Sequence, residues 1–139
     1  MTSSQVRLRE APADRLRGAE HLIVLSDAVV TLRAEARETI QGHRQIALLH
    51  GPTLRLVLFA FDAGGQLSIP DAPGPLTLQG LSGSFRVRTS EEMYELRSGY
   101  LLLFDAGVSV DIEAIGEADL LLSISMYHGE ESVGTLDGS

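Results

Sequence analysis

The sequence predicts an all-β domain with one N-terminal helix. From Arg44 onward, short β-prone runs are separated by Gly, Pro, Asp and Ser, at the spacing typical of a sandwich or barrel. Only one segment, before Gly42, repeats apolar residues at helical spacing. Two stretches, Ala63–Gly83 and Gly99–Ala114, break their apolar alternation with Gly or Pro where a backbone must bend. Each stretch therefore predicts a strand, a tight turn and another strand.

Composition limits the class of protein. The chain has 139 residues, enough for one domain, which buries roughly two thirds of its unfolded surface on folding. A formal net charge of −8 repels a phosphate backbone, so we expect no nucleic-acid partner. The chain has no cysteine, which excludes disulfides, thiolate metal sites and thiol nucleophiles. No apolar run approaches the ~20 residues of a membrane-spanning helix, so we expect no membrane partner.

The two chain ends are polar. Residues 1–20 lack the apolar centre of a signal peptide, so we expect a flexible arm and a cytoplasmic location. Residues 21–128 are expected to form the single domain. Residues 129–139 are expected to form a flexible acidic tail.

The first regular element is expected to be the helix. A short apolar run, His21–Leu25, precedes Ser26, whose hydroxyl can cap a helix over Asp27–Gln41, with Gly42 as its stop. One stripe of this segment is apolar, as a helix lying on a sheet requires. The stripe consists of Val29, Leu32, Ala36 and Ile40.

Eight or nine strands are expected to follow. Turns between them have identifiable causes: Gly64 and Gly65 supply positive φ, and Pro73–Pro75 sets a bend. The predicted strands are Gln45–His50, Thr53–Phe61, Gln66–Ile69, Leu76–Leu81, Ser84–Arg88, Met93–Leu96, Tyr100–Phe104, Ser109–Ile115 and Leu120–Tyr127.

From Gly42 to Tyr127, the chain resembles the cupin superfamily, specifically its small single-domain bacterial members. The glycine framework and spacing of cupin motifs are kept in Leu54–Gly65, in Ala72–Gly83, and in Gly99–Gly107 with the strand that follows. The resemblance implies a double-stranded β-helix, or jelly-roll barrel, with the helix packed outside. It also implies a metal centre held by histidines and an acidic residue inside the barrel.

The ligand positions of that metal centre carry other residues. The first two histidine positions hold Pro70 and Ala72. The acidic position falls on Leu76 or Thr77, and the last histidine position holds Val110. Pro, Ala, Leu and Val have no side-chain donor atom, and Thr is a poor ligand for transition metals. We therefore expect no metal ion and no cofactor.

Strand alternation predicts a mostly apolar barrel lining. Val110 and Ile112 are expected to point inward while Asp111 and Glu113 point outward, and Thr77 and Gln79 are expected to share the inner face as its polar groups. Such a lining suits a small, largely apolar ligand fixed by one or two hydrogen bonds. The candidate pocket residues are Ser68, Pro70, Leu76, Thr77, Gln79, Ser109, Val110 and Ile112.

Other polar residues favour plainer interpretations. His50 and His128 end strands and could meet as a relocated metal site, but isolated strand-end histidines are usually half-exposed polar residues. Arg86 and Arg88 alternate on one strand face. A carboxylate-binding pair is conceivable there, yet a solvated or salt-bridged outer face is favoured.

The leading functional hypothesis is a metal-free cupin-like protein that binds a small apolar molecule or acts as an interaction module. The alternative is an enzyme. It would be a metal-independent isomerase or lyase using Gln79, Tyr94, Tyr100 or Asp105, or a dioxygenase with relocated metal ligands.

Two further expectations concern the barrel interior and the assembly. If Leu76, Val110 and Ile112 seal the interior, a structural barrel without an internal ligand becomes the better hypothesis. We also expect a homodimer, because exposed strand edges need covering and His21–Leu25 could extend a partner's sheet.

Overall fold

The computed structural model describes residues 20–35, 39 and 41–126. Within them it contains one helix, α2 (Leu25–Ala34), and nine strands. The strands are β1 His43–His50, β2 Leu54–Phe61, β3 Gln66–Ile69, β4 Leu76–Ser82, β5 Ser84–Arg88, β6 Met93–Arg97, β7 Leu101–Phe104, β8 Val110–Ala114 and β9 Ala118–Ser125.

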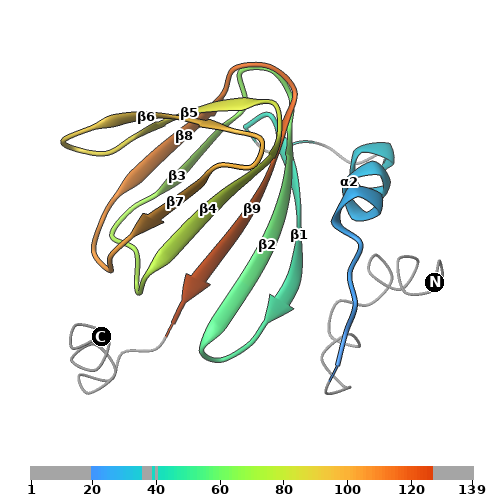
Figure 1. Ribbon diagram of the computed structural model, residues 1–139, viewed down its shortest axis with the longest axis horizontal. Helices are drawn as coiled ribbons and strands as arrows, with labels where there is room; N and C mark the ends of the chain where they lie inside the picture. The colour runs from blue at the N-terminus through green and yellow to red at the C-terminus, as the bar shows by residue number, and fades with distance from the viewer. Residues whose placement is uncertain (1–19, 36–38, 40, 127–139) are drawn as a thin grey trace.

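The strands form two antiparallel sheets that face each other (Figure 1). One sheet has the order β1-β2-β9-β4-β7, and the other has the order β3-β8-β5-β6. The chain crosses repeatedly between the sheets, so that β7 and β8, consecutive in sequence, belong to different sheets. The all-β architecture with one N-terminal helix is therefore confirmed.

The space between the sheets is filled by apolar side chains. Phe61 on β2 and Phe85 on β5 meet edge to face, with ring centroids 5.3 Å apart. Both are completely buried, as are Leu78 on β4 and Leu96 on β6. Protein interiors pack as densely as organic crystals. These side chains therefore fill the space between the two sheets and hold the sheets together.

Helix α2 covers the outer face of the five-stranded sheet over β1 and β2 (Figure 1). Its Val29 and Leu32 pack on Leu58 and Ala60 of β2. The helix begins at Leu25 with Val24 as its N-cap, so the expected cap by Ser26 is wrong.

The helix is also shorter than expected. It ends at Ala34, because the backbone of Glu35 is extended, with φ −70° and ψ 135°. Gln41 and Gly42 then take positive φ and turn the chain into β1. The expected stripe residues Ala36 and Ile40 lie outside the described residues.

One arginine fastens α2 to the sheet. The Nη2 of Arg33 donates to the carbonyl oxygens of Phe61, at 3.0 Å, and Ala118, at 3.2 Å. It also donates to Oδ1 of Asp119 at 2.8 Å. The other carboxylate oxygen of Asp119 accepts from Ser82 Oγ at 2.6 Å, so this carboxylate joins the helix, β9 and β4.

The expected ends of the chain are only partly tested. The proposed acidic tail and all of the proposed arm except Glu20 lie outside the described residues. None of the helical structure among residues 20–35, 39 and 41–126 has the length and apolar composition needed to cross a membrane.

Candidate functional site

The centre of the barrel is closed by carbon atoms. Leu76, Val110 and Ile112 are at most 2% exposed and belong to the apolar cluster between the sheets. Ala72 completes this region and is also 2% exposed. The inward direction of Val110 and Ile112 is as expected from strand alternation, and both pack in the apolar cluster between the sheets.

Two of the expected inner residues lie on the other face. Leu76 and Leu78 of β4 are fully buried between the sheets, so Thr77 and Gln79 face outward, which corrects the expected direction. Thr77 there hydrogen-bonds the hydroxyl of Ser123 on β9, and Gln79 is exposed. One alternation phase of β4 holds Leu76 and Leu78 and the other holds Thr77 and Gln79, and the phase with the two leucines takes the core.

The three remaining pocket candidates lie near the surface. Ser68 is exposed on the outer face of β3, where its Oγ donates to Asp111 Oδ1 at 2.6 Å. Pro70 is exposed just after β3. Ser109 is exposed beside β8, and its Oγ accepts from the backbone N–H of Asp71 at 2.8 Å. The eight candidates therefore do not line one pocket.

A hollow of about 460 Å³ lies at one end of the barrel, between the β5–β6 turn and the β7–β8 loop. We call it the mouth hollow. Its apolar wall consists of Tyr94 on β6, Phe104 on β7 and Val108, all half-buried. The rings of Tyr94 and Phe104 meet at 6.2 Å between centroids and 68° between planes. This volume lies within the range of small-molecule pockets, roughly 300–1,000 Å³.

The rim of the mouth hollow is acidic. Glu91 and Glu92 are exposed in the β5–β6 turn, and Thr89 Oγ1 accepts their backbone N–H groups at 3.3 and 3.1 Å. The hydroxyl of Ser109, also at the rim, is occupied by the backbone of Asp71. Such a rim repels anions and leaves the carboxylates available to a neutral or cationic ligand.

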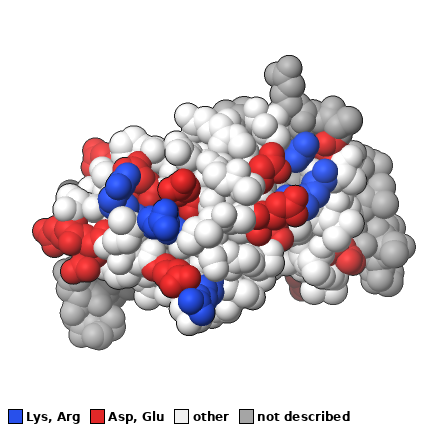
Figure 2. All heavy atoms as spheres, turned by 90° about the horizontal axis from the view of Figure 1, so that it is seen from above, with Lys and Arg blue, Asp and Glu red and all other residues white. Residues whose placement is uncertain are grey.

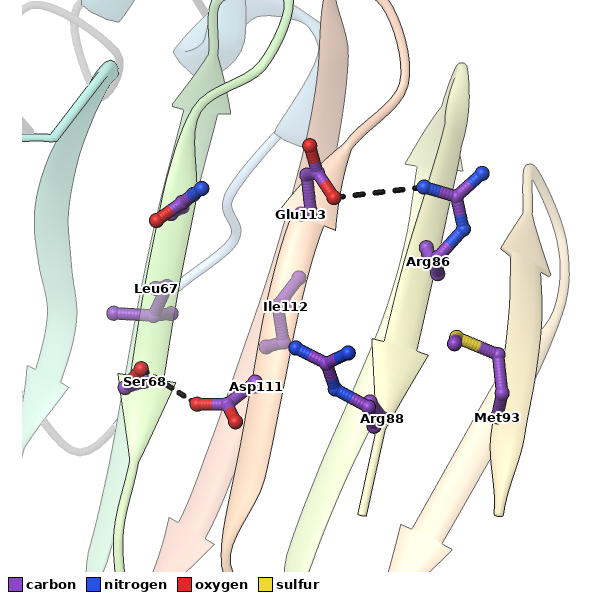
Figure 3. A pocket seen from close by; sticks show the side chains of 9 residues that line it. Leu67, Ser68, Arg86, Arg88, Met93, Asp111, Ile112 and Glu113 are labelled. Carbon is purple, nitrogen blue, oxygen red and sulfur yellow. Dashed lines mark hydrogen bonds and ion pairs between the residues drawn. The ribbon is translucent and has the colours of Figure 1, made fainter.

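A second hollow, of about 590 Å³, lies on the outer face of the four-stranded sheet (Figure 3). We call it the sheet hollow. Arg86 and Arg88 of β5 and Asp111 and Glu113 of β8 contribute its charged groups. Figure 2 shows acidic and basic side chains interleaved on the surface seen from above. The outward direction expected for Asp111 and Glu113 is confirmed, since they alternate along β8 with the buried Val110, Ile112 and Ala114.

Solved structures with the same architecture include named cupins. A cupin superfamily protein from Desulfitobacterium hafniense is 20% identical, with a TM-score of 0.63 over 81% of this chain and 96% of that chain. An RmlC-like cupin from Shewanella frigidimarina is 16% identical, with a TM-score of 0.62 over 81% of this chain and 96% of that chain. This chain has the cupin fold.

A further structural match is a conserved protein of unknown function from Streptococcus pyogenes. It is 18% identical, with a TM-score of 0.64 over 83% of this chain and 94% of that chain. The sequence matches no protein-family model, and the search among curated proteins finds no match. The likeness to these solved cupins is therefore a likeness of three-dimensional structure, and it concerns the fold alone.

The metal centre implied by the cupin resemblance does not fit the residues present. The positions expected to carry ligands hold the buried carbon side chains of Ala72, Leu76 and Val110, and the exposed Pro70; Thr77, the other residue for the acidic position, faces outward and bonds Ser123. A metal ion there would face groups without lone pairs. Elsewhere among the described residues, no group of three His, Asp or Glu side chains converges as a metal site. The relocated pair of His50 and His128 is untested, because His128 lies outside the described residues.

The residues named for the enzyme alternative are scattered. Tyr94 faces the mouth hollow, whereas Gln79 is exposed on the outer face of β4. Tyr100 is 52% exposed before β7, and Asp105 is exposed after it. The cupin fold here does not join these side chains into one reactive group.

Proposed function

We propose that this cupin-fold chain is a metal-free binding protein whose ligand is a small, largely apolar molecule held at the barrel mouth. The observation that carries the proposal is the aromatic pair Tyr94 and Phe104, half-buried at the wall of the mouth hollow. Half-buried aromatic side chains at the wall of a hollow suit a ligand that packs on their rings, rather than a ligand that coordinates a metal ion.

The acidic rim narrows the class of ligand. Glu91 and Glu92 add negative charge to a chain whose formal net charge is already −8. An anionic ligand would be repelled at this rim, whereas a neutral or cationic apolar molecule would not. The proposed ligand therefore has an aromatic or aliphatic body and no carboxylate or phosphate.

Fluorescent probes of different charge test this proposal. We expect the neutral probe N-phenyl-1-naphthylamine to bind the full chain at least about tenfold more tightly than the anionic probe 8-anilinonaphthalene-1-sulfonate. Tyr94→Ala should weaken binding of the neutral probe by about tenfold, because one aromatic wall is lost. Tyr100→Ala is the matched control, since Tyr100 is 52% exposed and is not a wall of the mouth hollow.

Partial loss of packing needs its own control, because Tyr94 also packs on the apolar cluster. Tyr94→Leu keeps an apolar side chain there, and its melting temperature should stay closer to that of the original chain. Probe affinity that is equal in the original chain, Tyr94→Ala and Tyr94→Leu, with all three folded, would contradict a site at the mouth.

We also propose that the chain forms a homodimer and acts in the cytoplasm. The observation behind the dimer is β7, an edge strand whose Leu101 and Leu103 are 56% and 68% exposed. Edge strands with apolar side chains readily pair with another chain. The run His21–Leu25, proposed to extend a partner's sheet, carries the exposed Leu22 and Val24, although its Leu25 begins α2.

The enzyme alternative is not favoured by any contact among the described residues. The cytoplasmic location and the lack of a nucleic-acid partner remain predictions from the N-terminal sequence and the net charge.

A further inference from the structure

The outward side chains of β8 and β5 form two neighbouring columns of opposite charge. Asp111 and Glu113 alternate along β8, while Arg86 and Arg88 alternate along β5. The strand register sets Glu113 opposite Arg86 and Asp111 opposite Arg88. Neighbouring strands lie about 5 Å apart, and residues on one face of a strand about 7 Å apart, so the four groups span a small molecule.

The two cross-strand pairs are not equivalent. Arg86 Nη1 lies 3.5 Å from Glu113 Oε1, whereas Asp111 Oδ1 accepts a hydrogen bond from Ser68 Oγ at 2.6 Å (Figure 3). Ser68 belongs to β3, on the side of Asp111 opposite to β5. Within residues 20–35, 39 and 41–126, the side chain of Arg88 makes no hydrogen bond or ion pair.

The unpaired guanidinium of Arg88 lies beside one exposed apolar side chain. It lines the sheet hollow together with Met93, which is 51% exposed on β6 directly opposite Arg88 in the strand register. Leu67 and Ile112 also border this hollow, but Ile112 is 2% exposed and both pack on the apolar cluster between the sheets. A ligand that reaches Arg88 can therefore cover the thioether of Met93 at the same time.

Charge identifies the class of ligand. The formal charges of the two arginines and the two acidic residues cancel, while the chain as a whole carries −8. A plain anion is repelled by the chain, and a plain cation leaves the guanidinium of Arg88 without a partner. A zwitterion has no net charge, and it offers an anionic group to Arg88 and a cationic group to the acidic residues of β8. A guanidinium group can bind a carboxylate through two parallel hydrogen bonds.

We propose that the sheet hollow binds a free α-amino acid with an apolar side chain. Its carboxylate pairs with Arg88, its ammonium group lies over Asp111 and Glu113, and its side chain packs on Met93. This inference uses a different face of the four-stranded sheet from the mouth hollow, and it stands or falls independently of the proposed function.

Three small molecules separate the two charges. L-leucine carries both, 4-methylpentanoate lacks the ammonium group, and 3-methylbutylamine lacks the carboxylate. Titrated into the full chain and followed by calorimetry and by amide NMR shifts, L-leucine should bind with a dissociation constant of about 0.1–1 mM. Each of the two analogues should bind at least about tenfold more weakly.

Variants locate the site. Arg88→Gln should weaken L-leucine binding by at least about tenfold, and Arg88→Lys should give an intermediate affinity because it keeps the charge but not the fork. Arg97→Gln is the matched control, since this exposed arginine of β6 pairs with Glu95 at 3.0 Å and does not line the sheet hollow. Arg88 is exposed, so both of its variants should keep the melting temperature of the original chain.

Ser68→Ala tests why Arg88 is free. Without the Ser68 hydroxyl, Asp111 can turn to Arg88, so L-leucine affinity should fall although no charge has been removed.

The proposal is overturned if L-leucine shows no binding up to about 10 mM, well above the expected dissociation constant. It is equally overturned if 4-methylpentanoate binds as well as L-leucine, or if Arg88→Gln and Arg97→Gln bind L-leucine alike. Binding of the neutral fluorescent probe should be unchanged in Arg88→Gln, which separates this test from that of the mouth hollow.

Discussion

Arg33 on α2 and Asp119 on β9 are 86 residues apart in sequence and are joined by a hydrogen bond of 2.8 Å. The same guanidinium nitrogen reaches two backbone carbonyls, so one side chain fixes the end of the helix on the sheet. The pair is partly screened from water, with side-chain exposures of 24% for Arg33 and 12% for Asp119. The helix is therefore held by a directional polar contact as well as by apolar packing.

Replacing Arg33 should destabilise the chain. Arg33→Met keeps an apolar stem but leaves Asp119 and two carbonyl oxygens without this donor, and we expect a loss of about 1–3 kcal/mol in the free energy of unfolding. Urea unfolding measures the loss. Arg97→Met, which breaks an exposed pair with Glu95, should cost less than about 0.5 kcal/mol. Equal losses in the two variants would show that Arg33 does not anchor the helix.

A hydroxyl in the closed interior should be costly. Val110→Thr changes the shape of a 1% exposed side chain very little but buries a polar group, so we expect a loss of about 1–3 kcal/mol. The matched control is Val30→Thr on α2, where the side chain is 68% exposed and the change should cost under about 0.5 kcal/mol. Thermal or urea unfolding compares the two. An insensitive Val110→Thr variant would mean that water reaches the barrel centre.

Elemental analysis of untagged chain purified without chelator should find far less than one transition-metal ion per chain, because the positions implied by the cupin resemblance hold carbon side chains. A chelator should then leave the melting temperature unchanged. Near-stoichiometric Mn, Fe, Ni, Cu or Zn would contradict the metal-free proposal and direct attention to His50 and His128.

A charge on the exposed edge strand should disrupt the proposed dimer. Leu103→Lys places an ammonium group where the side chain is 68% exposed, so the fold should persist while pairing weakens. Light scattering at micromolar concentration should change from dimer to monomer mass. Val30→Lys, at the same 68% exposure on α2, is the control and should remain dimeric. A monomeric original chain would remove the dimer proposal.

Strands with clean alternation could be predicted from the sequence. The bounds of β3 and β5 agree with the expected ranges, because apolar and polar residues alternate between clear turn signals. The predicted face of β4 is wrong, although Leu76 and Leu78 share one phase and Thr77 and Gln79 the other, so that alternation alone favours the observed face. Gly80 lies in the phase that faces the core, where an added Cβ would collide with the backbone of Arg97.

The two hollows show a different limit of sequence reasoning. Tyr94 and Phe104 line one wall but come from two sheets, Val108 joins them from the β7–β8 loop, and no spacing rule brings the three together. The charged residues of the sheet hollow could be placed on outer strand faces, but their partners could not be predicted. That Ser68 binds Asp111 and leaves Arg88 free follows only from the order β3-β8-β5.

The alternation of apolar and charged residues along β5 affects how this strand aligns with β6 and β8 during folding. Phe85 and Val87 are fully buried, while Arg86 and Arg88 face water. A slip of one residue against β6 or β8 would put two guanidinium groups into the apolar interior, so misaligned pairings of this strand are excluded energetically. The sequence of β7, LLLF, has no charged residue that would oppose a one-residue slip. Its register against β4 therefore depends on the packing of the neighbouring strands. Mispaired intermediates, where they form, should therefore involve β7 rather than β5.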